Sequence, residues 1–334
     1  MNALKTGIVR YFQFWSGLIF LAYHLFRQGI YKKKIIRIIE KKFQSPENDG
    51  TLSKALLAKI KYYSSFMPVM VGDIYCLMRG YPMSAKELEM QTYLSIFTPI
   101  FDEWFDNPAF TSDPLYKIIF QHDPFIPRNS FESLTADILL TLHRLAPESE
   151  RWTDMAQKLI ESQTIGLKQT DAQFSLKDIR HVTFDKAGYA LLLTRFFLEH
   201  PLSIEEEKAI MQFGCMIQYF DDIFDIREDY LAGIRTLATE STDINALTAD
   251  YTAELGKTFR LFEETTYEKH AQKRFKYTIC LLFSMPYIAL YQLQKAQKKR
   301  GGSFDISLLT RAELVCDMAK VRNWGLWFWF YITK

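Results

Sequence analysis

Glycine, proline and cysteine are all scarce in this sequence. Its 334 residues include only 14 Gly, 11 Pro and 4 Cys. Sandwiches, barrels and Rossmann-type folds depend on many tight turns that use Gly and Pro, so this composition argues against them. The cysteines lack the spacing of a zinc site and lie in apolar segments, so we expect reduced core side chains of a cytoplasmic protein rather than disulfides. They are Cys76, Cys215, Cys280 and Cys316.

An excess of one charge is also missing. The 41 Lys and Arg residues nearly balance the 39 Asp and Glu residues, and the formal net charge is +2. This balance argues against nucleic acid as the main partner. Residues 27–42 are a local exception, with seven basic residues and one acidic residue in a helical pattern. Such a segment is either a solvated helix face or a helix that rests on the anionic inner face of a membrane.

The N-terminal apolar run does not indicate a transmembrane helix or a cleavable signal peptide. Residues 12–26 are strongly apolar, but Gln13, Ser16 and His24 interrupt the run. It is shorter than the ~20 residues that span a bilayer, and no small-residue cleavage site follows it. We therefore expect a buried or interfacial helix there.

Helical periodicity and aromatic side chains are abundant instead. Hydrophobic residues make up 48% of the chain and aromatic residues 15%. Apolar positions recur with helical spacing nearly everywhere, and two Ser–Glu pairs, beginning at Ser84 and Ser203, have the spacing of capping boxes. The longest predicted helices cover residues 52–79, 84–106, 149–169, 176–199, 204–231, 244–298 (with a break near 267) and 306–331.

These features predict an all-α fold. No stretch resembles an interdomain linker, an internal repeat or a low-complexity segment. We therefore predict one domain for residues 1–334, in the form of an antiparallel helix bundle. Residues 1–50 would be an N-terminal helical extension, and residues 51–334 would form the bundle.

The most informative segment is an acidic cluster at residues 218–229. It continues an apolar helical stretch without a helix breaker, and at about 100° per residue its polar positions share one helix face. Carboxylates four residues apart repel each other, and in apolar surroundings they are either protonated or neutralised by cations. Because the flanking residues are mainly Met, Phe, Tyr and Ile, a solvated acidic face fits less well than a site for Mg²⁺. The positions on this face are Gln218, Asp221, Asp222, Asp225, Glu228 and Asp229.

A smaller acidic pair lies upstream. Asp102 and Asp106 are also four residues apart, within the aromatic segment 97–107. Such a pair is by itself typical of a helix surface. Two acidic helices that face each other across a bundle can, however, hold several Mg²⁺ ions and thereby bind a diphosphate. The sequence therefore predicts that this pair completes the metal site.

Together the two acidic motifs resemble those of class I terpene synthases and trans-isoprenyl diphosphate synthases. The similarity is greater to squalene/phytoene synthases and to bacterial large-terpene synthases of the tetraprenyl-β-curcumene synthase type. The second motif of that family, Asp-x-x-x-Asp-x-x-Glu-Asp, matches Asp221, Asp225, Glu228 and Asp229. A looser similarity is the Lys-Ala-Gly-Tyr segment at 186–189, which has Ala where the family's Lys-Gly-Gly-type segment has Gly.

The resemblance implies a bundle of the isoprenoid synthase type around a central apolar cavity. It also implies that a linear prenyl diphosphate is ionised, that pyrophosphate is released, and that the carbocation becomes a cyclic or linear terpene. About three Mg²⁺ ions, which Mn²⁺ can replace, would be bound by carboxylates. The implied metal ligands are Asp102, Asp106, Asp221, Asp222, Asp225, Glu228 and Asp229, with the catalytic role assigned to Asp102, Asp106, Asp221 and Asp225. The implied substrate-binding residues are Lys186, Tyr189, Gln218, Arg235, Phe101 and Phe220.

Several further side chains are weaker candidates for contacts with the substrate. Arg195, Arg274 and Lys276 could bind the diphosphate, although surface solvation is the simpler interpretation. Phe97 and Phe213 could stabilise a carbocation through their ring faces, although core packing is the simpler interpretation.

Two other functions stay open at this point. The same site could join two prenyl units, as squalene/phytoene-type or chain-elongating transferases do. Alternatively, the chain could be a non-catalytic helical protein of the membrane surface, whose acidic helix binds Ca²⁺ or a basic partner. The aromatic C-terminal segment 324–331 would be apolar on all sides of a helix, so it must be buried in its own domain, against a membrane or in a homodimer.

Overall fold

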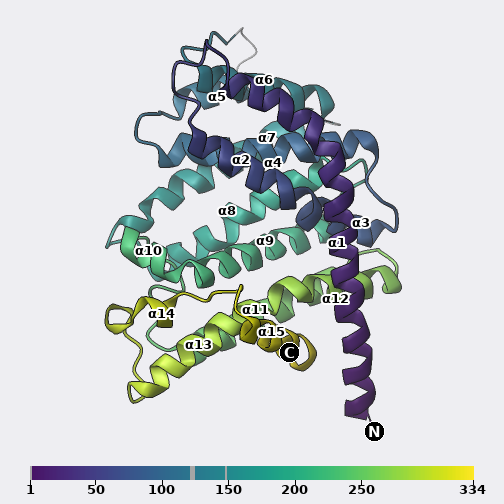
Figure 1. The fold of residues 1–334 in the computed structure, drawn as a ribbon, viewed down its shortest axis with the longest axis vertical. Coiled ribbons are helices and arrows are strands. Elements are labelled where there is room, and N and C mark those ends of the chain that lie inside the picture. Colours follow the sequence, from purple (N-terminus) through teal and green to yellow (C-terminus); the bar gives the residue numbers. More distant parts are fainter. Residues whose placement is uncertain (1, 121–124, 147–148) are drawn as a thin grey trace. The chain divides into compact units, whose positions relative to one another are not determined.

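A computed structural model describes residues 2–120, 125–146 and 149–334 (Figure 1). Within these residues every regular element is a helix and no strand is present, which confirms the predicted all-α fold. The α-helices are α1 (Asn2–Phe43), α2 (Lys54–Met67), α3 (Ile74–Arg79), α4 (Ala85–Asp106), α5 (Asp113–Phe120), α6 (Ser130–Leu145), α7 (Ser149–Gly166), α8 (Leu176–Phe196), α9 (Ile204–Phe224), α10 (Ile226–Ala232), α11 (Ile244–Glu263), α12 (Lys269–Phe283), α13 (Pro286–Lys299), α14 (Arg311–Leu314) and α15 (Val321–Thr333). A π-helix, η1 (Pro68–Asp73), and two 3₁₀ helices, η2 (Leu167–Thr170) and η3 (Ile306–Leu308), complete the set.

The predicted capping residues set two helix starts. Ser84 Oγ accepts a hydrogen bond from Glu87 N (3.1 Å), and Glu87 Oε2 accepts one from Ser84 N (2.7 Å), so α4 begins with a full capping box. Ser203 Oγ accepts a hydrogen bond from Glu206 N (3.1 Å) at the start of α9. These bonds satisfy N–H groups that the first helical turn leaves without partners.

Three of the longer predicted helices are interrupted in the structure. The predicted helix 204–231 ends at Phe224, and a second helix begins at Ile226. The predicted helix 244–298 has the expected break near 267 and a further one before Pro286, because proline is disfavoured in a helix interior but favoured in its first turn. The predicted helix 306–331 is replaced by the short elements η3 and α14 and by α15.

Side-chain hydrogen bonds explain the interruption of that last segment. Glu313 binds the guanidinium of Arg300 (3.0 Å) and accepts a hydrogen bond from Thr310 N (3.0 Å), so α14 is capped and tied to the end of α13. Asn323 Nδ2, in the first turn of α15, donates to Asp317 O (2.8 Å) in the segment that precedes this helix. These contacts compete locally with a continuous helix.

The chain divides into two compact units. Unit 1 comprises Met1–Ile19, Glu161–Leu192 and Leu202–Lys334, and unit 2 comprises Phe20–Ile160 and Leu193–Pro201. The expectation of a single domain with a separate N-terminal extension stays a prediction. None of the helices, over the part of the chain that the structure describes, has both the length and the apolar composition needed to cross a membrane.

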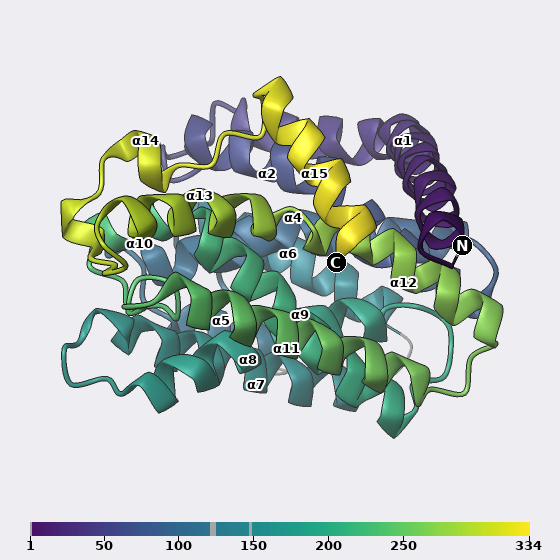
Figure 2. The ribbon, with the colours of Figure 1, turned by 90° about the horizontal axis from the view of Figure 1, so that it is seen from below.

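The core of unit 1 is built around α9 and α11. These two helices run side by side, and α13 packs against both of them (Figure 2). Phe213 of α9 is fully buried, with its ring centroid 5.4 Å from that of Phe283. Tyr251 of α11 is also fully buried, and its hydroxyl donates to Phe283 O (2.9 Å). This aromatic packing fixes the position of α9, on which the acidic cluster lies.

The core of unit 2 is built around α4, which packs against α2 and α6. Trp104 of α4 is buried with its ring centroid 4.9 Å from that of Phe131, and its Nε1 donates to Thr135 Oγ1 (3.3 Å). At the other end of α4, Glu87 forms an ion pair with Arg79 in which both side chains are buried. Unit 2 therefore holds α4, which carries the upstream acidic pair, at both of its ends.

Candidate functional site

The downstream acidic cluster lies where α9 ends and α10 begins. Asp221 and Asp222 belong to the last turn of α9, and Asp225 joins the two helices with φ −93° and ψ 12°. The interruption hardly changes the predicted spacing, because Asp225 N donates to Asp221 O (2.8 Å) and Asp229 N donates to Asp225 O (2.9 Å). The carboxylates therefore follow one another at intervals of about one helical turn.

The aspartates of this cluster make the ionised forms of their neighbours less favourable. Asp221 is open to water on one side, yet desolvation by the surrounding protein and then the charge of Asp225 raise the pKa of Asp221 to about 6. Desolvation, followed by the charges of Asp225 and Asp221, raises the pKa of Asp229 to about 7. Desolvation and then Glu228 also raise the pKa of Asp225. Bound cations would relieve this repulsion.

Asp222 is the most deeply buried carboxyl group of the cluster. Gln218 Nε2 donates to Asp222 Oδ1 (2.8 Å), while Asp222 Oδ2 is buried without a hydrogen-bond partner among the described residues. Desolvation raises the pKa of Asp222 to about 8, with further contributions from Asp229 and Asp221. Gln218 was predicted to bind substrate, and the structure shows it holding an aspartate of the cluster.

Lys186 acts electrostatically on the same cluster. Its ammonium group lowers the pKa values of Asp221, Asp222 and Asp229, in opposition to the larger effects that raise them. Two glycines bring α8, which carries Lys186, close to α9. A Cβ atom on Gly214 would lie 2.5 Å from Gly188 Cα, so the two helix backbones are in contact there. Gly188 of the Lys-Ala-Gly-Tyr segment therefore lies where the two helices pack closely.

The predicted aromatic residues differ in their surroundings. Phe220 is half-buried and stacks on Phe224, with ring centroids 4.8 Å apart and an interplanar angle of 23°. Tyr189 is half-buried on α8. Phe213, by contrast, lies in the core of unit 1 with its ring 6.0 Å from that of Phe275. Phe213 is therefore a core residue, whereas substrate contact by Phe220 and Tyr189 stays a prediction.

Most of the other predicted basic residues have different partners. Arg235 donates to the backbone oxygens of residues 171 (3.1 Å), 172 (3.0 Å) and 174 (2.5 Å) and binds Glu240 (2.6 Å). Arg195 is buried and donates to the carbonyl oxygens of His200 (3.1 Å) and Pro201 (3.1 Å). Lys276 binds Glu263 (3.1 Å). These three side chains hold loops and helices together, whereas Lys186 acts on the aspartates of the cluster.

The remaining polar residue of the motif is Glu228. It is exposed and forms an ion pair with its neighbour Arg227 (3.2 Å). Arg227 therefore contacts the exposed end of the acidic face. A surface pair of this kind contributes little to stability, so Glu228 can exchange this partner for a ligand.

The upstream acidic pair belongs to unit 2. Asp102 is half-buried and Asp106 is exposed, both close to the C-terminal end of α4. Phe101 is buried between Phe97 and Phe105, with ring centroids 5.8 and 5.1 Å away. That the pair shares ions with the downstream cluster stays a prediction, because the two motifs lie in different units.

A polar network next to the cluster was not predicted. Tyr219 Oη donates to Asp250 Oδ2 (2.6 Å), and Arg180 binds Asp250 (2.7 Å) and Glu254 (3.3 Å). Gln212 Nε2 donates to Glu254 (2.9 Å). The network links α8, α9 and α11 of unit 1. Its only signal in the sequence is the pair of acids four residues apart on α11.

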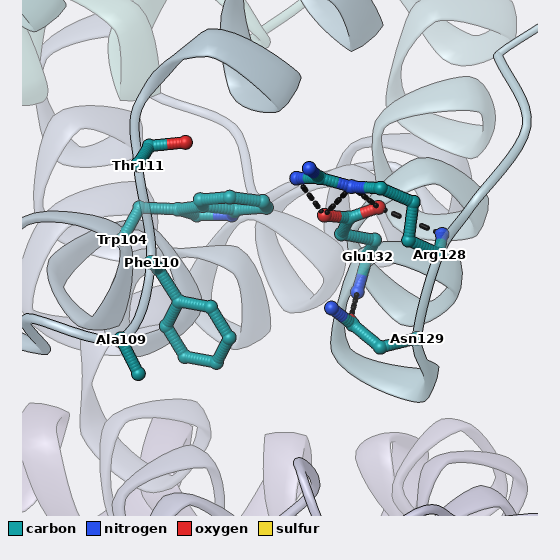
Figure 3. A pocket seen from close by; sticks show the side chains of 7 residues that line it. All are labelled: Trp104, Ala109, Phe110, Thr111, Arg128, Asn129 and Glu132. Atoms are coloured by element: carbon teal, nitrogen blue, oxygen red, sulfur yellow. Dashed lines mark hydrogen bonds and ion pairs between the residues drawn. The ribbon is translucent and has the colours of Figure 1, made fainter.

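The linings of two cavities include none of the predicted metal ligands. One, of about 300 Å³, lies in unit 2 between Trp104, Phe110 and the ion-paired Arg128 and Glu132 (2.6 Å), as Figure 3 shows. The other, of about 350 Å³, lies in unit 1 and is lined by basic and aromatic side chains. Neither is lined by an acidic residue of the two motifs, and of the weaker candidates only Lys276 lines the second, so the central apolar cavity stays a prediction.

Comparison with known proteins adds no family to this description. No protein-family model matches the chain, and no curated protein sequence matches it. The resemblance to terpene synthases therefore depends on the two acidic motifs and, more loosely, on the segment 186–189.

The donor set of the cluster fits a hard divalent cation. Among the described residues no group of three or more His, Cys, Asp or Glu side chains is already arranged to hold a metal ion. The cluster supplies only carboxylate oxygens, however, and one of them, Asp222 Oδ2, is buried without a partner. Mg²⁺ uses one or two protein carboxylates together with substrate phosphates and water. The residues present therefore fit Mg²⁺ that binds together with a diphosphate.

Proposed function

We propose that the protein is a Mg²⁺-dependent enzyme of the class I terpene synthase type, which ionises a linear prenyl diphosphate. The observation that carries this proposal is the group of aspartates at the α9–α10 junction, whose pKa values are raised by desolvation and mutual repulsion. Such a cluster is unfavourable without cations.

The position of the acids on their helices supports the proposal. Helix C-termini carry partial negative charge, so acidic residues there are unfavourable and basic residues are favoured. Both α4 and α9 end with acidic residues, and neither has a basic residue in its last turn. This arrangement opposes ordinary helix stabilisation at both predicted motifs, and it favours the binding of cations.

Five residues of the cluster have a role under this proposal. Asp221, Asp225 and Asp229 would hold the cations, and Gln218 would orient Asp222. Lys186 would place a positive charge near the diphosphate. When the carbon–oxygen bond breaks, its electron pair leaves with pyrophosphate, and an allylic carbocation remains on the hydrocarbon. Bound Mg²⁺ would stabilise the charge that develops on the leaving group.

Pyrophosphate release is the direct test. The purified protein would be incubated with C15, C20 and C25 or longer prenyl diphosphates and Mg²⁺, or Mn²⁺ as a substitute. We expect release with at least one chain length. Asp221→Asn and Asp225→Asn should each lower the rate by about 100-fold or more, because each removes a charge that acts mainly in the transition state.

A matched control lies on the same helix. Glu205→Gln removes an exposed carboxylate from the first turn of α9, at the end opposite the cluster, and should leave the rate unchanged. The mass of the product distinguishes a terpene from the coupled product of a prenyltransferase. Absence of release from every substrate, with the protein folded and Mg²⁺ present, would contradict the proposal and favour a binding protein.

A further inference from the structure

Helix α1 has an exposed apolar stripe along its N-terminal half. Its members recur every three or four residues, so they share one helix face. All of them are exposed to solvent. They are Ile8, Phe12, Trp15, Ile19, Tyr23 and Phe26. Six large apolar side chains in one row are unusual on a soluble surface and indicate an interaction site.

The opposite face of α1 is already packed. Phe14 lies with its ring centroid 5.2 Å from that of Trp327 and 5.1 Å from that of Phe328. A Cβ atom on Gly17 would lie 2.5 Å from Leu281 Cδ1, so α1 approaches α12 closely there. Packing within the chain therefore accounts for one apolar face of α1 and leaves the stripe unexplained.

The same stripe becomes basic toward the C-terminal end of α1. Lys33, Arg37 and Lys41 continue its spacing and are exposed. Residues 1–42 contain nine Lys and Arg residues and one acid, Glu40, although the whole chain is nearly balanced in charge. Glu40 is already ion-paired with Lys61 (2.6 Å). An apolar stripe that continues into an excess of cations complements an anionic lipid surface, where tails and phosphate groups lie side by side.

Further aromatic and basic side chains of unit 1 adjoin α1. Tyr11 lies with its ring 5.9 Å from that of Phe328 on α15, and α15 also exposes Trp324 and Trp329. Tryptophan and tyrosine are typical of the membrane–water interface. The cavity of about 350 Å³ is lined in part by four cations of α1, α12 and the C-terminus. These cations are Arg10, Lys273, Lys276 and Lys334.

We propose that α1 docks the protein on an anionic membrane surface through this stripe. The apolar side chains would enter the interface, and the cations that follow them would contact lipid phosphates. A second copy of the chain fits the stripe less well. Parallel pairing of two α1 helices would place cations against cations, and antiparallel pairing would place cations against apolar side chains. The inference goes beyond the proposed function and does not depend on it, because binding is measured without turnover.

Vesicle co-sedimentation of the full chain is the test. We expect binding to vesicles of phosphatidylcholine mixed with phosphatidylglycerol, weak binding to phosphatidylcholine alone, and loss of binding at high salt. The variant F12S/I19S/F26S should reduce binding by about tenfold or more. The variant K33Q/R37Q/K41Q should do the same for the anionic vesicles only, and it leaves the apolar surface intact.

Matched controls exist elsewhere on the surface. The removed side chains Phe12, Ile19 and Phe26 are 66%, 68% and 73% exposed. The control variant Y62S/I126S/I204S removes side chains that are 66%, 82% and 67% exposed, and it should bind like wild type. K54Q/K59Q/K177Q is the control for the charge variant, since these lysines are also exposed.

Two results would overturn the proposal. The first is equal binding of wild type and both stripe variants to anionic vesicles. The second is absence of vesicle binding together with a dimer in sedimentation that F12S/I19S/F26S dissociates, because the stripe would then be an interface between copies of the chain. Loss of pyrophosphate release, with vesicle binding retained, would affect the proposed function alone.

Discussion

Asp222 is a buried carboxyl group that lies close to other carboxylates. It is buried beside two other carboxylates, and its pKa is raised to about 8 by desolvation and these neighbours. An acid whose pKa is higher in the folded state than in the unfolded chain binds its proton more tightly when folded. The metal-free protein should therefore lose stability as the pH rises from about 4 to about 8.

Asp222→Asn should weaken this pH dependence, because an amide does not titrate. The free energy of unfolding of the wild type should fall between pH 5 and pH 8 by on the order of 2–4 kcal/mol more than that of the variant, given about 1.4 kcal/mol per pKa unit. Urea unfolding at both pH values measures this difference. Saturating Mg²⁺ with pyrophosphate should reduce it. Identical pH dependence of the two proteins would contradict the raised pKa.

Residue identity and spacing were enough to find the acidic cluster, but not the partners of its basic neighbours. Asp221 and Asp225 stand out because carboxylates four residues apart on an apolar helix are costly. Arg235 looked like a diphosphate ligand, and its guanidinium instead binds backbone oxygens of residues 171–174. Main-chain carbonyls leave no pattern in a sequence, so contacts of this kind need coordinates.

Helix continuity was predictable where local signals decide it. The capping residues Ser84 and Ser203 gave correct helix starts. The segment 306–331 failed because Arg300 and Glu313, thirteen positions apart, hold a non-helical connection. The interruption at Asp225 is also invisible in the residue pattern, since the hydrogen bonds on both sides keep the helical spacing.

The close contact between α8 and α9 predicts how a substitution at Gly214 affects stability. Gly214→Ala would place a methyl group 2.5 Å from backbone atoms of Ala187 and Gly188, and backbone cannot yield as a side chain can. We expect a loss of about 2 kcal/mol or more in the free energy of unfolding, together with weaker binding of Mg²⁺–pyrophosphate, because α8 carries Lys186.

A glycine in the same unit provides the control for Gly214→Ala. Gly256 of α11 has no atom closer than 3.7 Å to the position of an added Cβ, so Gly256→Ala should be neutral or stabilise by up to about 1 kcal/mol. Thermal unfolding and calorimetric titration measure both effects. Equal stability of the two variants would show that the helices can separate without cost.

The buried pair of Arg79 and Glu87 joins α3 to α4. Desolvation alone would raise the pKa of Glu87, but hydrogen bonds from Arg79 and from backbone N–H groups outweigh it and lower the pKa. Glu87→Gln leaves the arginine charge buried and should destabilise the protein by about 3–5 kcal/mol at neutral pH. Because the pKa of Glu87 is lower in the folded protein than in the unfolded chain, the ionised carboxylate stabilises the fold at pH values above the unfolded pKa. This contribution should therefore disappear as the pH falls below about 4.

Chemical unfolding at pH 7 and at acid pH checks this prediction. Glu89→Gln, two residues away on the same helix and only half-buried, should change stability by less than about 1 kcal/mol. A Glu87→Gln variant as stable as the Glu89→Gln variant at neutral pH would contradict the argument. So would a difference from wild type that persists unchanged in acid.

At the scale of the whole molecule, the resemblance assigns metal ligands to two separate acidic motifs. Asp102 belongs to unit 2 and Asp221 to unit 1, and the resemblance implies that both bind cations around one diphosphate. If so, the losses in affinity for pyrophosphate at saturating Mg²⁺ caused by Asp102→Asn and Asp221→Asn should not add. The interaction energy of the double-mutant cycle should be about 0.5–3 kcal/mol.

A control cycle combines Asp221→Asn with Asp113→Asn, which changes an exposed acid of unit 2. In this cycle the losses in affinity should add within about 0.5 kcal/mol. Calorimetric titration gives all of these affinities. Additive losses for Asp102 and Asp221 would mean that the two motifs act on different ligands, and the downstream cluster would then have to bind a diphosphate alone.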